Sequence, residues 1–315
     1  MKLNTSIAGI DFDGFAYNAC GVNDEILKQL EKLGDSDSAA ILLKSCSIEP
    51  RKGNENPKYI VKSNLIPGCT LNSMGLSNRG LEENLSYVDS LKTTNKKPVI
   101  ASLTCFSKEE HLILFKAFQD QGKADLIELN FSCPNVGAHG LIGYYPELVD
   151  EILTQLDTTK GNIKYGIKLP PYFEEWYFDK ISDIILKHNV GFISCINTLG
   201  NALVIDAEKE STVIKPNFGR GGLGGDWIKP IALSNVNSFY RRLDRKISIV
   251  GVGGVRNGKD AFEFLLAGAD SVQVGSAFAQ ESYPIFTKIH NELNQILESK
   301  GYNSVQEAKG KLKFL

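Results

Sequence analysis

Short apolar runs of strand length alternate with helical patterns eight times along this chain. In one of the helical patterns, Phe178, Ile181 and Ile185 recur at three- and four-residue spacing and would share one face. Eight strand–helix units predict an α/β fold, a (β/α)8 TIM barrel whose parallel sheet lies inside a ring of helices. The predicted strands cover residues 15–20, 39–44, 98–103, 125–131, 163–169, 191–196, 247–252 and 271–274.

Three segments do not fit this repeat. Residues 4–14 predict an N-terminal β-hairpin over the bottom of the barrel, with Asp13-Gly14 supplying the turn. Residues 45–81 and 198–225 are too long for ordinary connections and follow the second and sixth strands. We expect them to be long inserted loops at the C-terminal face, where barrel enzymes carry their active sites.

Composition restricts the class of protein. We expect residues 1–315 to form a single domain, because a barrel of this size is common and no long Pro/Ser linker interrupts the chain. A formal net charge of -2 gives no reason to expect nucleic acid or a membrane as partner, and no run has the roughly 18 apolar residues of a membrane span. Six cysteines without metal-ligand spacing and only four histidines argue against a metal site. We interpret the cysteines as reduced and the protein as cytoplasmic.

The stretch 126–135, Leu-Ile-Glu-Leu-Asn-Phe-Ser-Cys-Pro-Asn, is the best candidate for an active-site segment. Pro134 cannot continue a central strand, so the strand should end near Ser132 and leave Cys133 on a loop. Asn130 and Asn135 flank this thiol and could orient a planar polar ligand. The alternative is that Cys133 is a small buried apolar side chain, as most free cysteines are.

Glycine clusters follow the seventh and eighth strands. Gly253 and Gly254 end the first cluster, and Gly275 precedes Ser276 in the second. These two loops of a barrel often bind a phosphate through backbone N–H groups, and glycine allows the close approach that such a site needs. Either cluster alone could be an ordinary tight turn, but together they favour a bound phosphate. A third cluster, 221–225, could be a flexible loop or a further backbone contact.

Two lysines and two more asparagines lie at strand ends or in the first insertion. Lys44 and Lys168 close the second and fifth strands between apolar neighbours, where a lysine needs an anion or a hydrogen-bonding partner. One of them could stabilise charge on a reduced, phosphate-bearing redox cofactor. Asn72 and Asn197 could be turn formers, or could bind a flat ligand that carries carbonyls and ring N–H groups.

These motifs, in this order, resemble the dihydroorotate dehydrogenases, and among them the soluble, fumarate-dependent class 1A. The similarity runs from about residue 4 to the C-terminus. The tail and the Pro-Pro-Tyr-Phe run are typical of class 1A, and a cysteine at position 133 distinguishes the chain from the membrane-associated class, which has serine there. The matching motifs are 72–76, 130–135, 168–173, 214–216, 251–254 and 310–313.

The resemblance implies FMN as cofactor, oxidation of dihydroorotate to orotate, fumarate as electron acceptor, and a homodimer. It implies that Cys133 takes the C5 proton, that the C6 hydride goes to FMN, and that Lys168 stabilises the reduced cofactor. The implied substrate-binding residues are Lys44, Asn72, Ser73, Met74, Gly75, Leu76, Asn130, Asn135, Asn197 and Thr198. The implied FMN-binding residues are Cys20, Gly21, Lys44, Ser45, Asn130, Lys168, Ile196, Gly225, Gly253, Gly254, Gly275 and Ser276.

The loop after Asn135 departs from the family pattern, because 137–141 reads Gly-Ala-His-Gly-Leu where the family usually has a Pro-Gly-Lys-Pro-Gln run. Two other functions therefore stay open. One is an FMN oxidoreductase that acts on another dihydropyrimidine or cyclic imide. The other is a flavin-binding protein with little turnover. A colourless phosphate-sugar isomerase or aldolase barrel is a further alternative.

Overall fold

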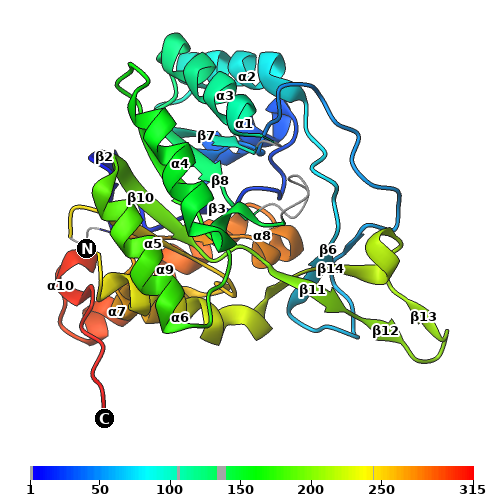
Figure 1. Ribbon diagram of the computed structural model, residues 1–315. Coiled ribbons are helices and arrows are strands. Elements are labelled where there is room, and N and C mark those ends of the chain that lie inside the picture. The colour runs from blue at the N-terminus through cyan, green and yellow to red at the C-terminus, as the bar shows by residue number, and fades with distance from the viewer. Residues whose placement is uncertain (1–2, 105–106, 133–139, 244) are drawn as a thin grey trace.

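The computed structural model describes residues 3–104, 107–132, 140–243 and 245–315. Within them, eight parallel strands alternate with helices and form one sheet that is nearly closed into a barrel (Figure 1). The predicted (β/α)8 architecture is confirmed. In sheet order the strands are β3 (Ala16–Asn18), β16 (Ser271–Val274), β15 (Ser248–Val252), β10 (Val190–Cys195), β9 (Lys164–Lys168), β8 (Leu126–Asn130), β7 (Val99–Leu103) and β4 (Ile41–Leu42).

Helices cover the outer face of this sheet. In α5 (Glu175–Lys187), for example, Phe178, Ile181 and Ile185 are buried, so the apolar face predicted from the sequence packs into the core. The main core therefore lies between helices and barrel. The helices are α1 (Leu27–Asp35), α2 (Gly80–Thr94), α3 (Lys108–Gln121), α4 (Pro146–Asp157), α5 (Glu175–Lys187), α6 (Lys229–Tyr240), α7 (Gly258–Ala267), α8 (Ser276–Glu281), α9 (Pro284–Ser299) and α10 (Val305–Ala308).

A side chain joins the two strands at the ends of the sheet. Asn18 Nδ2 donates to the carbonyl of Leu42 at 2.7 Å, and Leu42 N donates to Asn18 Oδ1 at 2.9 Å. One backbone bond, from Ala39 N to the carbonyl of Ala16, lies below them. The amide of Asn18 thus takes the place of the backbone groups that β3 would otherwise present to β4.

The N-terminal hairpin is present, but its predicted turn was wrong. Strands β1 (Thr5–Ile7) and β2 (Ile10–Phe12) are joined by Ala8 and Gly9, both at positive φ, as a type I′ hairpin turn requires. Asp13-Gly14 instead follows the second strand. Ala8 N donates to Ser248 Oγ at the start of β15, and Ile7 and Phe12 pack into the barrel interior, so the hairpin covers the N-terminal end of the barrel as expected.

The two insertions are not only loops. Strands β5 (Tyr59–Ile60) and β6 (Cys69–Asn72) of the first pair with β14 (Arg220–Gly225) and β11 (Leu199–Leu203) of the second in an antiparallel sheet of order β11-β14-β6-β5. This sheet extends from one end of the barrel (Figure 1). The second insertion also carries the short pair β12 (Ile205–Asp206) and β13 (Ser211–Thr212). Sequence periodicity missed this sheet because its strands are short and rich in glycine.

Candidate active site

A cavity of about 430 Å³ lies between the C-terminal ends of the barrel strands and the sheet formed by the insertions. This volume is sufficient for a cofactor or substrate-sized ligand. The structure brings together here every described residue that the sequence analysis assigned to a site. They are Cys20, Gly21, Lys44, Ser45, Asn72, Ser73, Met74, Gly75, Leu76, Asn130, Lys168, Ile196, Asn197, Thr198, Gly225, Gly253, Gly254, Gly275 and Ser276. Cys133 and Asn135 lie outside the described residues, although Ser132 lines the cavity.

One end of the cavity is formed by glycine-rich backbone. Gly225, Gly253 and Gly254 all have positive φ. A Cβ atom on Gly254 would lie 2.6 Å from Lys229 Cβ and 3.0 Å from the carbonyl oxygen of Gly225, so no other residue fits there. Beside them, Ser276 begins α8, and its hydroxyl lies 2.7 Å from Thr70 Oγ1 of the insertion sheet. Backbone without side chains, a helix start and a hydroxyl pair form a cradle of a kind that binds phosphate.

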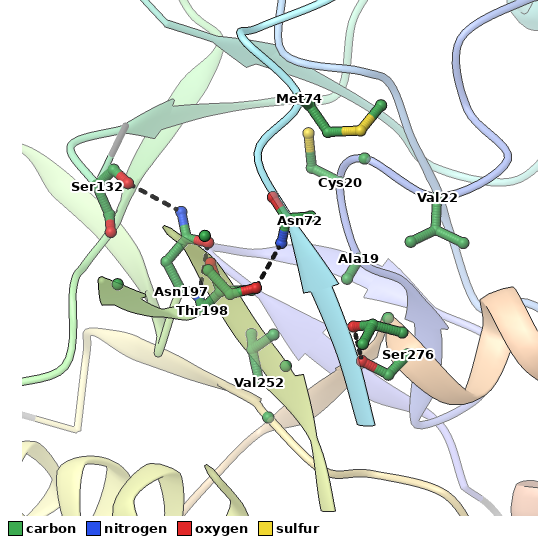
Figure 2. Close-up of a pocket in the computed structure, with 18 of the residues that line it drawn as sticks. Ala19, Cys20, Val22, Asn72, Met74, Ser132, Asn197, Thr198, Val252 and Ser276 are labelled. Carbon is green, nitrogen blue, oxygen red and sulfur yellow. Dashed lines mark hydrogen bonds between the residues drawn. The ribbon is translucent and has the colours of Figure 1, made fainter. Parts of the chain in front are cut away.

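The other end of the cavity carries side-chain amides (Figure 2). Asn197 Nδ2 donates to Asn130 Oδ1 at 3.2 Å, and Asn197 Oδ1 accepts from Thr198 N at 2.8 Å. Across the cavity, Asn72 Nδ2 donates to the carbonyl of Gly222 at 3.0 Å. The protein itself therefore fixes the orientation of two amides, whose remaining donors and acceptors suit a flat ligand that carries both.

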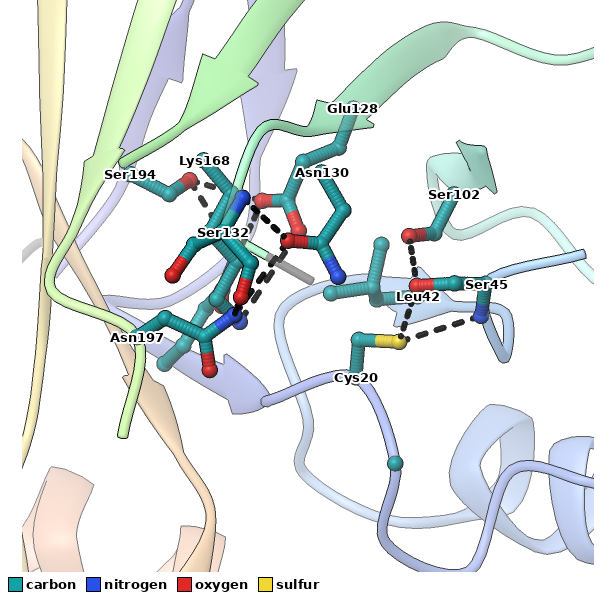
Figure 3. A network of polar contacts seen from close by, with 12 residues as sticks. Cys20, Leu42, Ser45, Ser102, Glu128, Asn130, Ser132, Lys168, Ser194 and Asn197 are labelled. Carbon is teal, nitrogen blue, oxygen red and sulfur yellow. Dashed lines mark hydrogen bonds and ion pairs between the residues drawn. The ribbon is translucent and has the colours of Figure 1, made fainter. Parts of the chain in front are cut away.

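Lys168 forms part of the floor of the cavity and is 4% exposed. Its Nζ donates to Gln273 Oε1 at 3.1 Å and lies 4.0 Å from Glu128 Oε1 (Figure 3). Burial and the nearby Glu128 carboxylate raise the pKa of Tyr17, which lies below them. The predicted need of Lys168 for a polar partner is thus met inside the barrel, by residues that local sequence did not indicate.

A second polar chain supports the wall of the cavity. Cys20 Sγ lies 3.0 Å from Ser45 Oγ, which is 2.8 Å from Ser102 Oγ (Figure 3). Nearby, Asp24 Oδ2 accepts from Gly21 N at 2.6 Å, and burial raises the pKa of Asp24 to about 6. These contacts hold the loop after β3, which carries Gly21, in position along the cavity.

The sequence analysis missed several lining residues. They share an origin in the two insertions, whose location at the C-terminal face was the only available signal. These residues include Tyr59, Thr70, Asn217 and Arg220. Within the described part of the chain, no group of acidic, histidine or cysteine side chains has the geometry of a metal site, and no helix is long and apolar enough to cross a membrane.

Comparison with known proteins assigns the family. A family model described as dihydroorotate dehydrogenase matches residues 2–297. A Kluyveromyces lactis protein named dihydroorotate dehydrogenase (fumarate) is 41% identical over 320 residues, which cover 100% of this chain and 99% of the relative. A Saccharomyces mikatae protein of the same name is 40% identical over 318 residues with the same coverage. A Streptococcus agalactiae relative is 41% identical over 316 residues, with both chains fully covered.

Proposed function

The chain belongs to the dihydroorotate dehydrogenase family, and we therefore propose that it oxidises (S)-dihydroorotate to orotate in de novo pyrimidine synthesis, with fumarate as electron acceptor. The observation that carries this proposal is that all 19 described residues assigned from the family pattern line one cavity. They come from both insertions and from the ends of several barrel strands. Residues that lie far apart in the sequence thus meet at one cavity, as the proposed active site requires.

We propose FMN as the cofactor, because the two ends of the cavity match its two chemical parts. The phosphate would lie in the cradle of Gly225, Gly253, Gly254, Gly275 and Ser276, where the only side chain is the short hydroxymethyl group of Ser276. The ring would lie toward Asn130, Lys168 and Ile196, alongside Cys20, Gly21, Lys44 and Ser45, where hydrogen-bonding groups meet an apolar wall. The donor set therefore fits the group.

The chain's own residues would bind, orient and deprotonate the substrate. Asn72, Asn197 and Asn130 would hold the ring of dihydroorotate through amide groups that the fold has already oriented, which lowers the entropic cost of alignment. Cys133 would remove the proton from C5 as general base. Lys168 would supply positive charge at the floor of the cavity. Bound FMN would accept the hydride from C6 and later reduce fumarate.

The remaining proposed substrate contacts lie on the two insertions and nearby strand ends. Residues 73–76 follow β6 and would close over the substrate, Thr198 would donate its hydroxyl, and Lys44 would meet an anionic group. Asn135 would complete the set of amides. We also propose that residues 1–315 form one FMN-binding domain, that two copies assemble as a homodimer, and that the protein works in the cytoplasm, consistent with the four described cysteines being free.

Anaerobic mixing of the purified protein with dihydroorotate tests the proposal. We expect a yellow protein whose long-wavelength flavin absorbance is lost on mixing, and a decrease in that rate by orders of magnitude in Cys133→Ala. Cys69→Ser is the matched control, because Cys69 is buried within β6 of the insertion sheet, where it packs with other apolar residues, and does not line the cavity. Fumarate should then restore the absorbance.

The other outcomes distinguish the alternatives. If the protein is yellow but only another dihydropyrimidine or a cyclic imide bleaches it, that compound and not dihydroorotate is the substrate. Yellow protein that no such compound bleaches would indicate a flavin-binding protein with little turnover. A colourless protein that neither binds added FMN nor requires it for activity would exclude a flavin cofactor. It would instead favour a phosphate-sugar isomerase or an aldolase.

A further inference from the structure

A buried carboxylate lies directly below the cavity and has no role in the function proposed above. Glu128 is in the middle of β8, two residues before Asn130, so the two side chains point to the same side of the strand, into the barrel. Glu128 is fully buried. A carboxylate in such a place costs several kcal/mol unless a cation or several donors compensate it.

The two oxygens of the Glu128 carboxylate have different surroundings. Oε2 accepts from Ser194 Oγ and from Gln273 Nε2, each at 2.7 Å. Oε1 accepts no hydrogen bond from any residue in the described part of the chain, and a charged group, Lys168 Nζ, lies 4.0 Å away. The unpaired oxygen is thus the one that faces the lysine.

Gln273 links the two charged side chains. Its Oε1 accepts from Lys168 Nζ at 3.1 Å while its Nε2 donates to Glu128 Oε2. An amide is suited to this place because one end accepts from an ammonium and the other donates to a carboxylate. Figure 3 shows Glu128 and Lys168 together beside Asn130.

We infer that Glu128 and Gln273 are positioning residues for the cofactor site. Glu128 supplies the countercharge that holds the Lys168 ammonium at the floor of the cavity, and Gln273 fixes the direction of that ammonium. Neither residue lines the cavity, so both act on the bound ring only through Lys168. This inference rests on the proposed FMN site.

Sulfite is a suitable probe because it adds reversibly to an oxidised flavin and leaves negative charge on the ring, which a nearby cation stabilises. We expect Lys168→Met to raise the sulfite Kd, because it removes the positive charge at the ring. Glu128→Gln should raise the Kd about tenfold, because the Lys168 ammonium loses the countercharge that holds it beside the ring. The matched control is Ser194→Ala, which removes one hydrogen bond from the carboxylate but leaves its charge in place; we expect a change of less than about threefold.

A double-mutant cycle separates this role from a general structural one. If Glu128 acts through Lys168, then Glu128→Gln has no further effect on sulfite affinity in a Lys168→Met background. Wild-type sulfite affinity in Glu128→Gln, or an undiminished effect of that change in the Lys168→Met background, would overturn the inference.

A second variant keeps the test valid if Glu128→Gln does not fold. Gln273→Met breaks the link at the other residue, and we expect a rise in sulfite Kd that again disappears in the Lys168→Met background. Unchanged affinity in this variant would contradict the assigned role of Gln273. FMN content, measured first, separates the two proposals: protein without FMN refutes the cofactor site, whereas FMN-loaded variants with wild-type sulfite affinity refute only the positioning role.

Discussion

The side chain of Asn18 forms two hydrogen bonds with the backbone of Leu42, one to its carbonyl and one from its N–H. Both residues are fully buried, so water cannot replace either bond. Strands β3 and β4 lie at the two ends of the hydrogen-bonded order of the sheet. One amide therefore completes the connection that brings Gly21 and Lys44, which follow these strands, to the same cavity.

Asn18→Ala should reduce the free energy of unfolding by roughly 2–4 kcal/mol, because it leaves two buried backbone groups without partners. Urea denaturation measures this loss. Asn64→Ala is the control, since Asn64 is exposed on a turn, and its effect should stay within about 0.5 kcal/mol. Equal stability of the two variants would show that β3 and β4 do not depend on the amide.

Two histidines, His111, which is buried, and His290, which is half-buried, predict a specific loss of stability in acid. Burial lowers the pKa of both His111 and His290 to about 4, below the value of about 6.5 in an unfolded chain. The folded state therefore binds fewer protons between these values. The stability contribution of each histidine is complete above pH 6.5, falls as the pH decreases toward 4, and is lost below that.

His290→Gln should remove the share of this pH dependence that comes from His290. His290 Nε2 accepts from the N–H groups of Phe15 and Ala16, so protonation would break both bonds. The loss for one such histidine between pH 7 and pH 4 is on the order of 3 kcal/mol. Denaturation at a series of pH values should give a smaller slope for the variant. An identical slope would mean that His290 does not titrate as proposed.

Gly275→Ala should fold but retain less FMN. The nearest atom to an added Cβ is Ala19 Cβ at 3.5 Å, an ordinary contact, and φ at this position is negative. The added methyl would instead narrow the cradle proposed for the phosphate. Flavin content after purification and the FMN Kd measure the effect. Gly200→Ala is the matched control, because it also lines the cavity, an added Cβ there meets nothing within 4 Å, and it is not part of the cradle.

Arg220 should steer anionic substrates into the site. Its side chain is exposed, it lines the cavity, and no ion pair joins it to another residue within the described ranges. Arg220→Glu should lower kcat/KM for dihydroorotate by about three- to tenfold at low ionic strength, with the difference shrinking as salt is added. Arg241→Glu makes the same charge change at the end of α6, away from the cavity. An equal effect of both variants would exclude local steering.

The sequence by itself determined the barrel and most of the candidate site. Each strand–helix unit is encoded locally, by apolar residues at period two or 3.6, and the C-terminal ends of parallel strands converge wherever such units form a barrel. Asn130, Lys168 and Gly253 could therefore be placed at one face before any contact was known. The exact strand limits were less well determined: residues 39–44 contain only the two-residue strand β4.

Only the tertiary structure decided how that site is completed. Asn72 meets Gly222 across 150 positions of sequence, and Lys168 meets Gln273 across 105. The strands of the insertions carry no strong periodicity, since their glycines and short lengths leave pairing to partners elsewhere in the chain. The same holds for Glu128, whose local context in β8 is that of any buried strand residue. Its countercharge comes from another strand, and long-range contacts of this kind have no local sequence signature.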